Sequence, residues 1–349
     1  KAKKSKTAKE RSYFYWDKSV KHGYVGWWGL ASLPKLNFNS TALKNEMYKG
    51  KKSIVRTWIL PQYGMSGWRI DVGNMTGRLG ADDLHDDVMH GIRQAMDETN
   101  LDAWLVAENG DFVASDLNGL GWHGAMNYQG FMRPVWNWLN RNSEIGGGFQ
   151  GLPFAMPQIS GQQLINSMKQ FNASVPWRSV TASMVLLDSH DTARFRTVVK
   201  GDVASHLSAM TMVLTYPGVP SIFAGDEIGL EGSWGEDGRR TINWEDRSQW
   251  DHNFMDNVRQ LISIRKSNDA LVNGGLRWIA AEKDFILYLR ESKKQSILVF
   301  VSRKGVNAKI DLSALGLHVT KTLYGNTASG SKFSVKSKGA TQAIWEVTR

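Results

Sequence analysis

Three short segments of the sequence place a carboxylate directly after an apolar run. Asp71 ends G-W-R-I-D, Glu108 ends L-V-A-E, and Asp191 lies in L-L-D-S-H-D-T-A-R. Two carboxylates on either side of a glycosidic bond can supply a nucleophile and a proton donor. A third can hold sugar hydroxyls and stabilise the positive charge of the transition state. These residue types therefore suit chemistry at a glycosidic bond.

The neighbours of these carboxylates suggest different roles for them. Arg69 lies two residues before Asp71 on the same strand face, so its charge is expected to keep Asp71 ionised as a nucleophile. Glu108 follows an apolar strand, and burial is expected to keep it protonated near neutral pH as a general acid. Taken singly, each carboxylate also fits a structural role, as a salt bridge, a helix cap or a polar turn beside His190. Three such residues at strand ends, in this order, favour catalysis.

Alternating strands and helices are needed to bring these segments together, and the sequence predicts them as far as residue 271. Strands are expected at residues 68–72, 102–107, 124–127, 183–188 and 219–224, and helices at 40–59, 82–99, 130–141, 204–215 and 254–267. Such alternation predicts parallel β/α units, in a barrel or a doubly wound sheet. In a barrel, the C-terminal strand ends converge on one mouth, where the chemistry takes place.

After residue 271 the apolar period changes to two, which predicts an antiparallel β-domain. The strands are expected at residues 285–290, 296–302, 308–312 and 343–347. We therefore predict two domains, a catalytic β/α portion over residues 1–271 and an all-β domain over residues 272–349. The first eleven residues form a basic tail.

Composition excludes several classes of protein. The chain has 349 residues, of which 42% are hydrophobic and 22% charged, and no apolar run approaches the roughly 18 residues of a membrane span. Part of the net charge of +10 comes from lysines in the basic tail, and no nucleic-acid-binding signature accompanies the rest. We therefore predict neither a membrane nor a nucleic-acid partner. The absence of cysteine excludes disulfides. The chain begins with Lys and shows no signal peptide, which slightly favours the cytoplasm without settling the compartment.

The segments around the three carboxylates resemble the signatures of the α-amylase family, glycoside hydrolase family 13, and within it the neopullulanase and cyclomaltodextrinase branch. Gly67 to Asp71 matches the nucleophile segment G-(F/W)-R-x-D, and Leu105 to Glu108 matches the acid/base segment, with Ala in place of the usual Gly. His190 to Arg194 matches H-D-T-x-R. Two accessory segments agree, L-P-K-L-N-F at Leu33 to Phe38 and G-V-P-S-I-F-A-G-D-E at Gly218 to Glu227.

This resemblance implies a (β/α)8 TIM barrel followed by a small antiparallel β-sandwich. It makes Asp71 the nucleophile, Glu108 the general acid/base and Asp191 the third catalytic carboxylate of a retaining α-glycosidase. The substrate-binding residues expected from it are Arg69, His190, Arg194, Asn74 and Met75, with Trp122 as a sugar-stacking platform. Arg194 is also expected to brace the site. Many amylases have Lys-His where this chain has Asn74-Met75, which makes ordinary endo-amylase action a weaker expectation.

The implied partner is an α-glucan, with α-1,4 or α-1,6 bonds of maltodextrins or cyclodextrins as the substrate. Transglycosylation and glucan binding without turnover remain alternatives. No cofactor is required by this chemistry, and a structural calcium ion stays an open alternative. The family's D-x-x-x-N-H signature and its first three strands are absent from the sequence. We therefore expect strands four to eight of an incomplete barrel, associating with the missing N-terminal portion or forming a homodimer.

Overall fold

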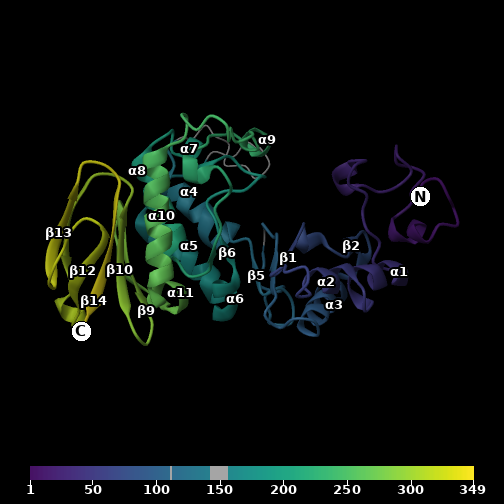
Figure 1. Cartoon of the computed structure of the whole chain (residues 1–349), viewed down its shortest axis with the longest axis horizontal. Helices are drawn as coiled ribbons and strands as arrows, with labels where there is room; N and C mark the ends of the chain where they lie inside the picture. Colours follow the sequence, from purple (N-terminus) through teal and green to yellow (C-terminus); the bar gives the residue numbers. More distant parts are fainter. Residues whose placement is uncertain (111, 142–155) are drawn as a thin grey trace. The chain divides into compact units, whose positions relative to one another are not determined.

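The computed structural model of the chain describes residues 1–110, 112–141 and 156–349. These residues divide into two compact units, Lys1–Met126 and Asn127–Arg349 (Figure 1). Within the described ranges, every helix is too short or too polar to cross a lipid bilayer. The predicted domain boundary between residues 271 and 272 falls inside the second unit and stays a prediction.

A parallel three-stranded sheet organises the first unit. Strand β1 (Gly67–Ile70) pairs with β4 (Trp104–Ala107), and β4 pairs with β5 (Gly124–Ala125). Helix α3 (His85–Asp97) connects β1 to β4 and has two acidic residues in its first turn, where they complement the helix dipole. The other elements are α1 (Thr41–Lys44), α2 (Ile54–Trp58), β2 (Arg78–Leu79) and β3 (Asp82–Asp83). The order β1, α3, β4 confirms the predicted parallel β/α unit.

The prediction of one helix over residues 40–59 is wrong, because the helix breaks at Gly50. There the backbone turns to an extended conformation, with φ −68° and ψ 149°. The Ser53 hydroxyl donates to the Tyr48 carbonyl oxygen (3.1 Å) just before α2 begins. A Cβ at Gly50 would lie 2.5 Å from the Asn45 carbonyl oxygen, so this tight exit from the helix requires glycine.

The second unit begins with helices around two short parallel strands, β6 (Met184–Val185) and β7 (Val219–Pro220). The strands predicted at 183–188 and 219–224 are therefore in the correct positions, but the observed strands are shorter than predicted. The helices are α4 (Arg133–Leu139), α5 (Gly161–Ser174), α6 (Trp177–Ala182), α7 (Phe195–Val198), α8 (Val203–Thr215), α9 (Gly235–Gly238), α10 (His252–Ser267) and α11 (Asp269–Asn273). Helix α5 was not predicted.

The chain from Gly275 onward forms two antiparallel sheets, which confirms the predicted antiparallel strands. The strands are β8 (Gly275–Ala281), β9 (Phe285–Glu291), β10 (Ser296–Ser302), β11 (Val306–Asp311), β12 (His318–Gly325), β13 (Lys332–Ser337) and β14 (Thr341–Thr348). Five of them pair in the order β12-β14-β10-β9-β8, and β11 pairs with β13. Side chains of both sheets share one apolar core, which contains Leu298, Ile310, Val335 and Trp345. Helix α8 packs against α10 and against β10 and β14, so most of its residues are buried (Figure 1).

Candidate active site

The ends of two paired strands position Asp71 and Glu108 in the first unit. Ile70 and Ala107 are register partners in the parallel pair of β1 and β4, and each carboxylate residue follows its strand directly. The Glu108 amide extends the ladder by donating to the Ile70 carbonyl oxygen (2.9 Å). Asp71 and Glu108 are far apart in the sequence but therefore lie side by side at the C-terminal end of the sheet.

One guanidinium group contacts both carboxylates. Arg69 forms an ion pair with Asp71 through Nη1, and its Nη2 lies 3.1 Å from Oε2 of Glu108. The two carboxylates therefore lie within the reach of a single planar cation. Their surroundings differ, because the side chain of Asp71 is 77% exposed and that of Glu108 is 9% exposed. A pair of carboxylates in unlike environments can divide acid and nucleophile roles between them.

The residue after Asp71 has a strained backbone. Val72 has φ 45° and ψ 48°, a left-handed conformation that β-branched residues rarely adopt. This conformation directs the Val72 amide to Oε2 of Glu108 at 2.8 Å. The next amide, that of Gly73, donates to the Glu108 carbonyl oxygen (2.8 Å). Backbone strain of this kind is typical of functional sites, and here it fixes the orientation of the Glu108 carboxylate.

Asn74 and Met75, the predicted acceptor-side residues, lie on the 3-10 turn Gly73–Met75 and are partly exposed. Protein side chains hold their carbonyl oxygens: Arg78 donates to that of Asn74 (2.6 Å) and Lys35 to that of Met75 (2.8 Å). Burial lowers the pKa of Lys35, which comes from the accessory segment L-P-K-L-N-F. That segment therefore supports the loop after Asp71. Sugar binding by Asn74 and Met75 stays a prediction.

The burial of Trp122 argues against its predicted contact with a sugar. The side chain is 1% exposed, and the ring stands edge-on to the ring of His85, with centroids 6.2 Å apart. A sugar can stack only on an open aromatic face, so this tryptophan serves the core of the first unit. The number of tryptophans in a sequence does not reveal which of them are exposed.

In the second unit, the carboxylate of Asp191 lies between the imidazole of His190 and the guanidinium of Arg239. Nε2 of His190 lies 3.3 Å from Oδ2 of Asp191, and Nη2 of Arg239 donates to Oδ1 (2.9 Å). Arg239 also donates through Nε to the carbonyl oxygen of His190 (2.7 Å). The side chain of Asp191 keeps 15% of its surface exposed, so the carboxylate is oriented by the protein and still accessible.

Arg239 is a site residue that the sequence analysis did not predict. The pair Arg239-Arg240 does continue the family pattern that begins with the accessory segment Gly218 to Glu227. We expect Arg239→Ala to lower kcat/KM on an α-glucan roughly 10- to 100-fold, because Asp191 loses the donor that orients it. Arg240→Ala is the matched control, since Arg240 pairs with Asp237 instead. Steady-state kinetics of the two variants would check this, and equal losses in both would contradict the role of Arg239.

Arg194, a predicted substrate-binding residue, is buried and directed at protein atoms. Its Nε donates to the Gly238 carbonyl oxygen (2.9 Å) and its Nη2 to that of Ala224 (2.9 Å). Nη1 pairs with Oδ1 of Asp226 at 2.7 Å, and the guanidinium carbon lies 3.8 Å from the centroid of the Phe223 ring. These contacts argue against direct sugar binding and fit the expected bracing role.

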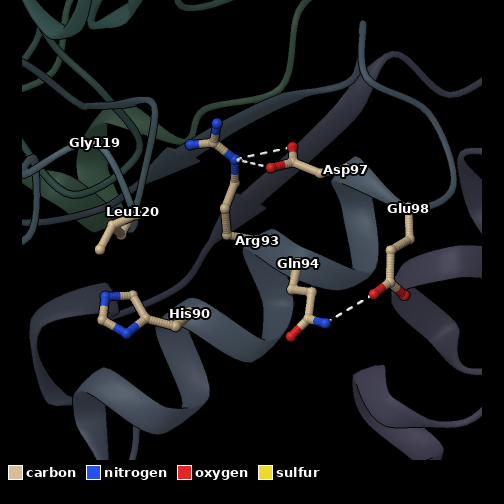
Figure 2. A pocket seen from close by; sticks show the side chains of 7 residues that line it. All are labelled: His90, Arg93, Gln94, Asp97, Glu98, Gly119 and Leu120. Carbon is tan, nitrogen blue, oxygen red and sulfur yellow. Dashed lines mark hydrogen bonds and ion pairs between the residues drawn. The ribbon is translucent and has the colours of Figure 1, made fainter.

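The pocket in Figure 2 lies on helix α3 in the first unit and does not contain the candidate carboxylates. Arg93, Gln94, Asp97 and Glu98 of this pocket already have protein partners. Nε of Arg93 donates to both oxygens of Asp97 (2.9 Å each), and Gln94 donates to Glu98 (2.8 Å). Paired groups of this kind are typical of a solvated helix face.

In residues 1–110, 112–141 and 156–349, no three His, Asp or Glu side chains gather as the ligands of a metal ion would. The alternative of a structural calcium ion stays a prediction.

The architecture is that of a TIM-barrel catalytic domain followed by a β-sheet C-terminal domain. Residues 3–285 match the α-amylase catalytic domain, and the chain belongs to the α-amylase family, glycoside hydrolase family 13. The predicted family is thereby confirmed.

Relatives of known activity are similar to most of the chain. An amylopullulanase of Thermoanaerobacterium thermosulfurigenes is 29% identical over 286 residues, which cover 75% of this chain and 14% of that protein. A cyclomaltodextrinase of a Bacillus species is 29% identical over 274 residues, covering 77% of this chain and 43% of that protein. The debranching enzyme of Nostoc punctiforme has the same fold, with a TM-score of 0.82 at 24% identity, over 99% of this chain and 71% of that one. The chain thus spans less than half the length of the curated relatives it matches.

Proposed function

We propose that the chain carries the catalytic residues of a retaining glycoside hydrolase that acts on α-glucans. The main support for this proposal is that the guanidinium of Arg69 contacts both carboxylates, of which Asp71 is exposed and Glu108 is buried. The named activities of the relatives support a substrate of the maltodextrin, cyclodextrin or pullulan class. The bonds would be α-1,4 or α-1,6 glucosidic linkages.

The proposed reaction is a double displacement. Asp71 attacks the anomeric carbon while Glu108 protonates the departing glycosidic oxygen, and a β-glycosyl ester of Asp71 forms. Glu108 then removes a proton from water, whose oxygen displaces Asp71 and restores the α configuration. Before the attack, the guanidinium of Arg69 pairs with the carboxylate of Asp71. From the resemblance to the family, Asp191 and His190 of the second unit are proposed as residues that bind sugar hydroxyls.

We also propose that β1, β4, β5, β6 and β7 correspond to strands four to eight of the family's barrel. Their parallel pairing and the position of each motif after its strand support this assignment. The chemistry described needs no cofactor, because both proton transfer and nucleophilic attack are assigned to side chains.

The test of the function is the stereochemistry of the first product. The 349-residue chain is incubated with maltotriose, β-cyclodextrin or pullulan, and proton NMR follows the anomeric signals before mutarotation. We expect α-anomers to appear first from at least one of these glucans. Initial β-anomers would contradict the double displacement, whereas oligomers longer than the substrate would indicate transfer to a sugar in place of water. Affinity for the glucans without any product would contradict hydrolysis.

A further inference from the structure

A buried histidine of the first unit links the loops that follow β1 and β4. His85 is fully buried at the start of α3. Its Nδ1 lies 3.0 Å from the carbonyl oxygen of Thr76, and its Nε2 forms an ion pair with Oδ1 of Asp116 at 3.2 Å. Thr76 belongs to the loop that begins with Asp71, and Asp116 to the loop that begins with Glu108. One imidazole ring therefore contacts both loops.

A further contact joins Asp116 to the residue that follows Glu108. The other carboxylate oxygen of Asp116 accepts from Nδ2 of Asn109 (3.1 Å), and Asn109 directly follows Glu108 in the sequence. Oδ1 of Asp116 also accepts from the hydroxyl of Ser115 (3.0 Å). Since Asp116 is buried as well, a rotation of the loop that carries Glu108 would leave a buried charge without its partners.

We infer that His85 and Asp116 form a positioning pair that holds the loops of Asp71 and Glu108 in register for catalysis. The inference rests on the proposed function of these two carboxylates, because His85 and Asp116 are assigned no contact with the substrate. A charged His85 side chain between the two loops restricts their positions more than an apolar side chain would. Its interactions with Thr76 and Asp116 are directional, so a displacement of either loop breaks them.

The electrostatics of the pair favour a charged histidine. Burial lowers the pKa of His85, but the hydrogen bond and negative charge of Asp116, together with the Thr76 carbonyl oxygen, outweigh burial and raise it overall. Burial likewise opposes the ionisation of Asp116, and His85 nevertheless holds its pKa below the ordinary value. The other charged groups that face His85 are Arg78, which disfavours the imidazolium, and Asp83, whose carboxylate accepts from the His85 amide (3.4 Å).

The sign of the pH dependence follows from these two shifts. Because the pKa of His85 is raised on folding, its contribution to stability is complete below its ordinary pKa of about 6.5 and is lost as pH rises through the higher folded value. The pKa of Asp116 is lowered, so its contribution is present above its ordinary value of about 4 and is lost only in more acidic solution. The positioning pair is therefore strongest between roughly pH 4 and 6.5 and weakens on the alkaline side.

Hydrogen exchange at the backbone amides of Val72 and Gly73 tests the pair, because both amides donate to Glu108. We expect His85→Ala and Asp116→Asn to speed exchange at these two amides at least tenfold, with little change at Ile92 within α3. The control is His90→Gln, a change on the same helix at a histidine that lines the pocket of Figure 2. Unchanged exchange at Val72 and Gly73, or the same acceleration throughout the first unit, would overturn the inference.

Kinetics provide the second readout. We expect Asp116→Asn to lower kcat on maltotriose about tenfold with KM changed less than threefold, and to move the alkaline limb of kcat to lower pH, since the anion that raises the pKa of His85 is lost. A lower kcat/KM caused only by a higher KM would contradict a positioning role. If the unmodified chain turns over no α-glucan, the proposed function fails, while the exchange experiment still decides whether the pair holds the two loops.

Discussion

Glu108→Gln and Asp71→Asn are expected to abolish most of the hydrolysis of maltotriose while leaving the fold intact. Removal of a general acid typically costs about 10²- to 10⁴-fold in rate, so kcat should fall by that factor in Glu108→Gln. Loss of the nucleophile blocks the covalent intermediate, and Asp71→Asn should cost roughly 10⁴-fold or more. The measurement is the release of reducing ends at saturating substrate.

The two variants should differ with an activated substrate. α-Glucosyl fluoride has a leaving group that needs little protonation, so the first step in Glu108→Gln should be largely restored, whereas Asp71→Asn should stay inactive. Asp86→Asn is the matched control, because Asp86 is an exposed aspartate in the first turn of α3. If Asp71→Asn retained more than about a tenth of the activity, another residue would have to be the nucleophile.

The paired strand ends could be predicted because their signal is local. An apolar run that ends in a carboxylate indicates a buried strand and the side chain at its end, and the spacing of Arg69 and Asp71 puts both on one strand face. The structure brings Arg69, Asp71 and Glu108 together as that pattern implies. The strands predicted at residues 285–290 and 296–302 likewise match β9 and β10, which are buried at nearly every position.

Contacts between distant loops could not be predicted. Arg239 lies 48 residues from Asp191, and His85 lies 31 residues before Asp116. Arg239 continues a family motif and His85 has no such signal, but in neither case does the sequence state which opposite charge the residue meets. Their importance comes from burial and tertiary contact, which only the folded chain defines.

Helix α5 shows a signal that was present and not used. Its apolar residues Leu164, Ile165, Met168 and Phe171 recur at helical spacing and are buried. Ser160 and Gln163 also form a capping box, in which each side chain bonds to the backbone amide of the other. The pattern S-x-x-Q before an apolar residue indicates a helix start. The cap and the apolar spacing together therefore indicate this helix in the sequence.

The largest expected effect on stability lies at Arg194, in the second unit. Arg194→Met removes the cation that pairs with Asp226 and leaves the carbonyl oxygens of Ala224 and Gly238 without their donors. Breaking a buried pair from one side typically costs about 3 to 5 kcal/mol, which lowers the melting temperature by roughly 10 °C in a unit of this size. Differential scanning calorimetry at neutral pH would measure it. A change of less than about 3 °C would show that the contact network does not brace the loops.

Asp188 is the carboxylate next to Asp226. In contrast to Arg194→Met, Asp188→Asn should not lower the melting temperature. Burial raises the pKa of Asp188 well above its ordinary value, and the charge of Asp226 raises it further, so folding favours the neutral carboxyl. An acid whose pKa rises on folding contributes less stability as pH increases from its ordinary pKa, roughly 4, through the folded value.

The asparagine of Asp188→Asn reproduces the neutral acid and can still accept a hydrogen bond from the Phe195 amide, which lies 2.6 Å from Oδ2. Asp188→Asn should therefore match or exceed the unmodified chain in melting temperature at pH 7 and lose this part of the pH dependence. A large loss of stability at pH 7 would instead show that Asp188 is ionised and needed as an anion.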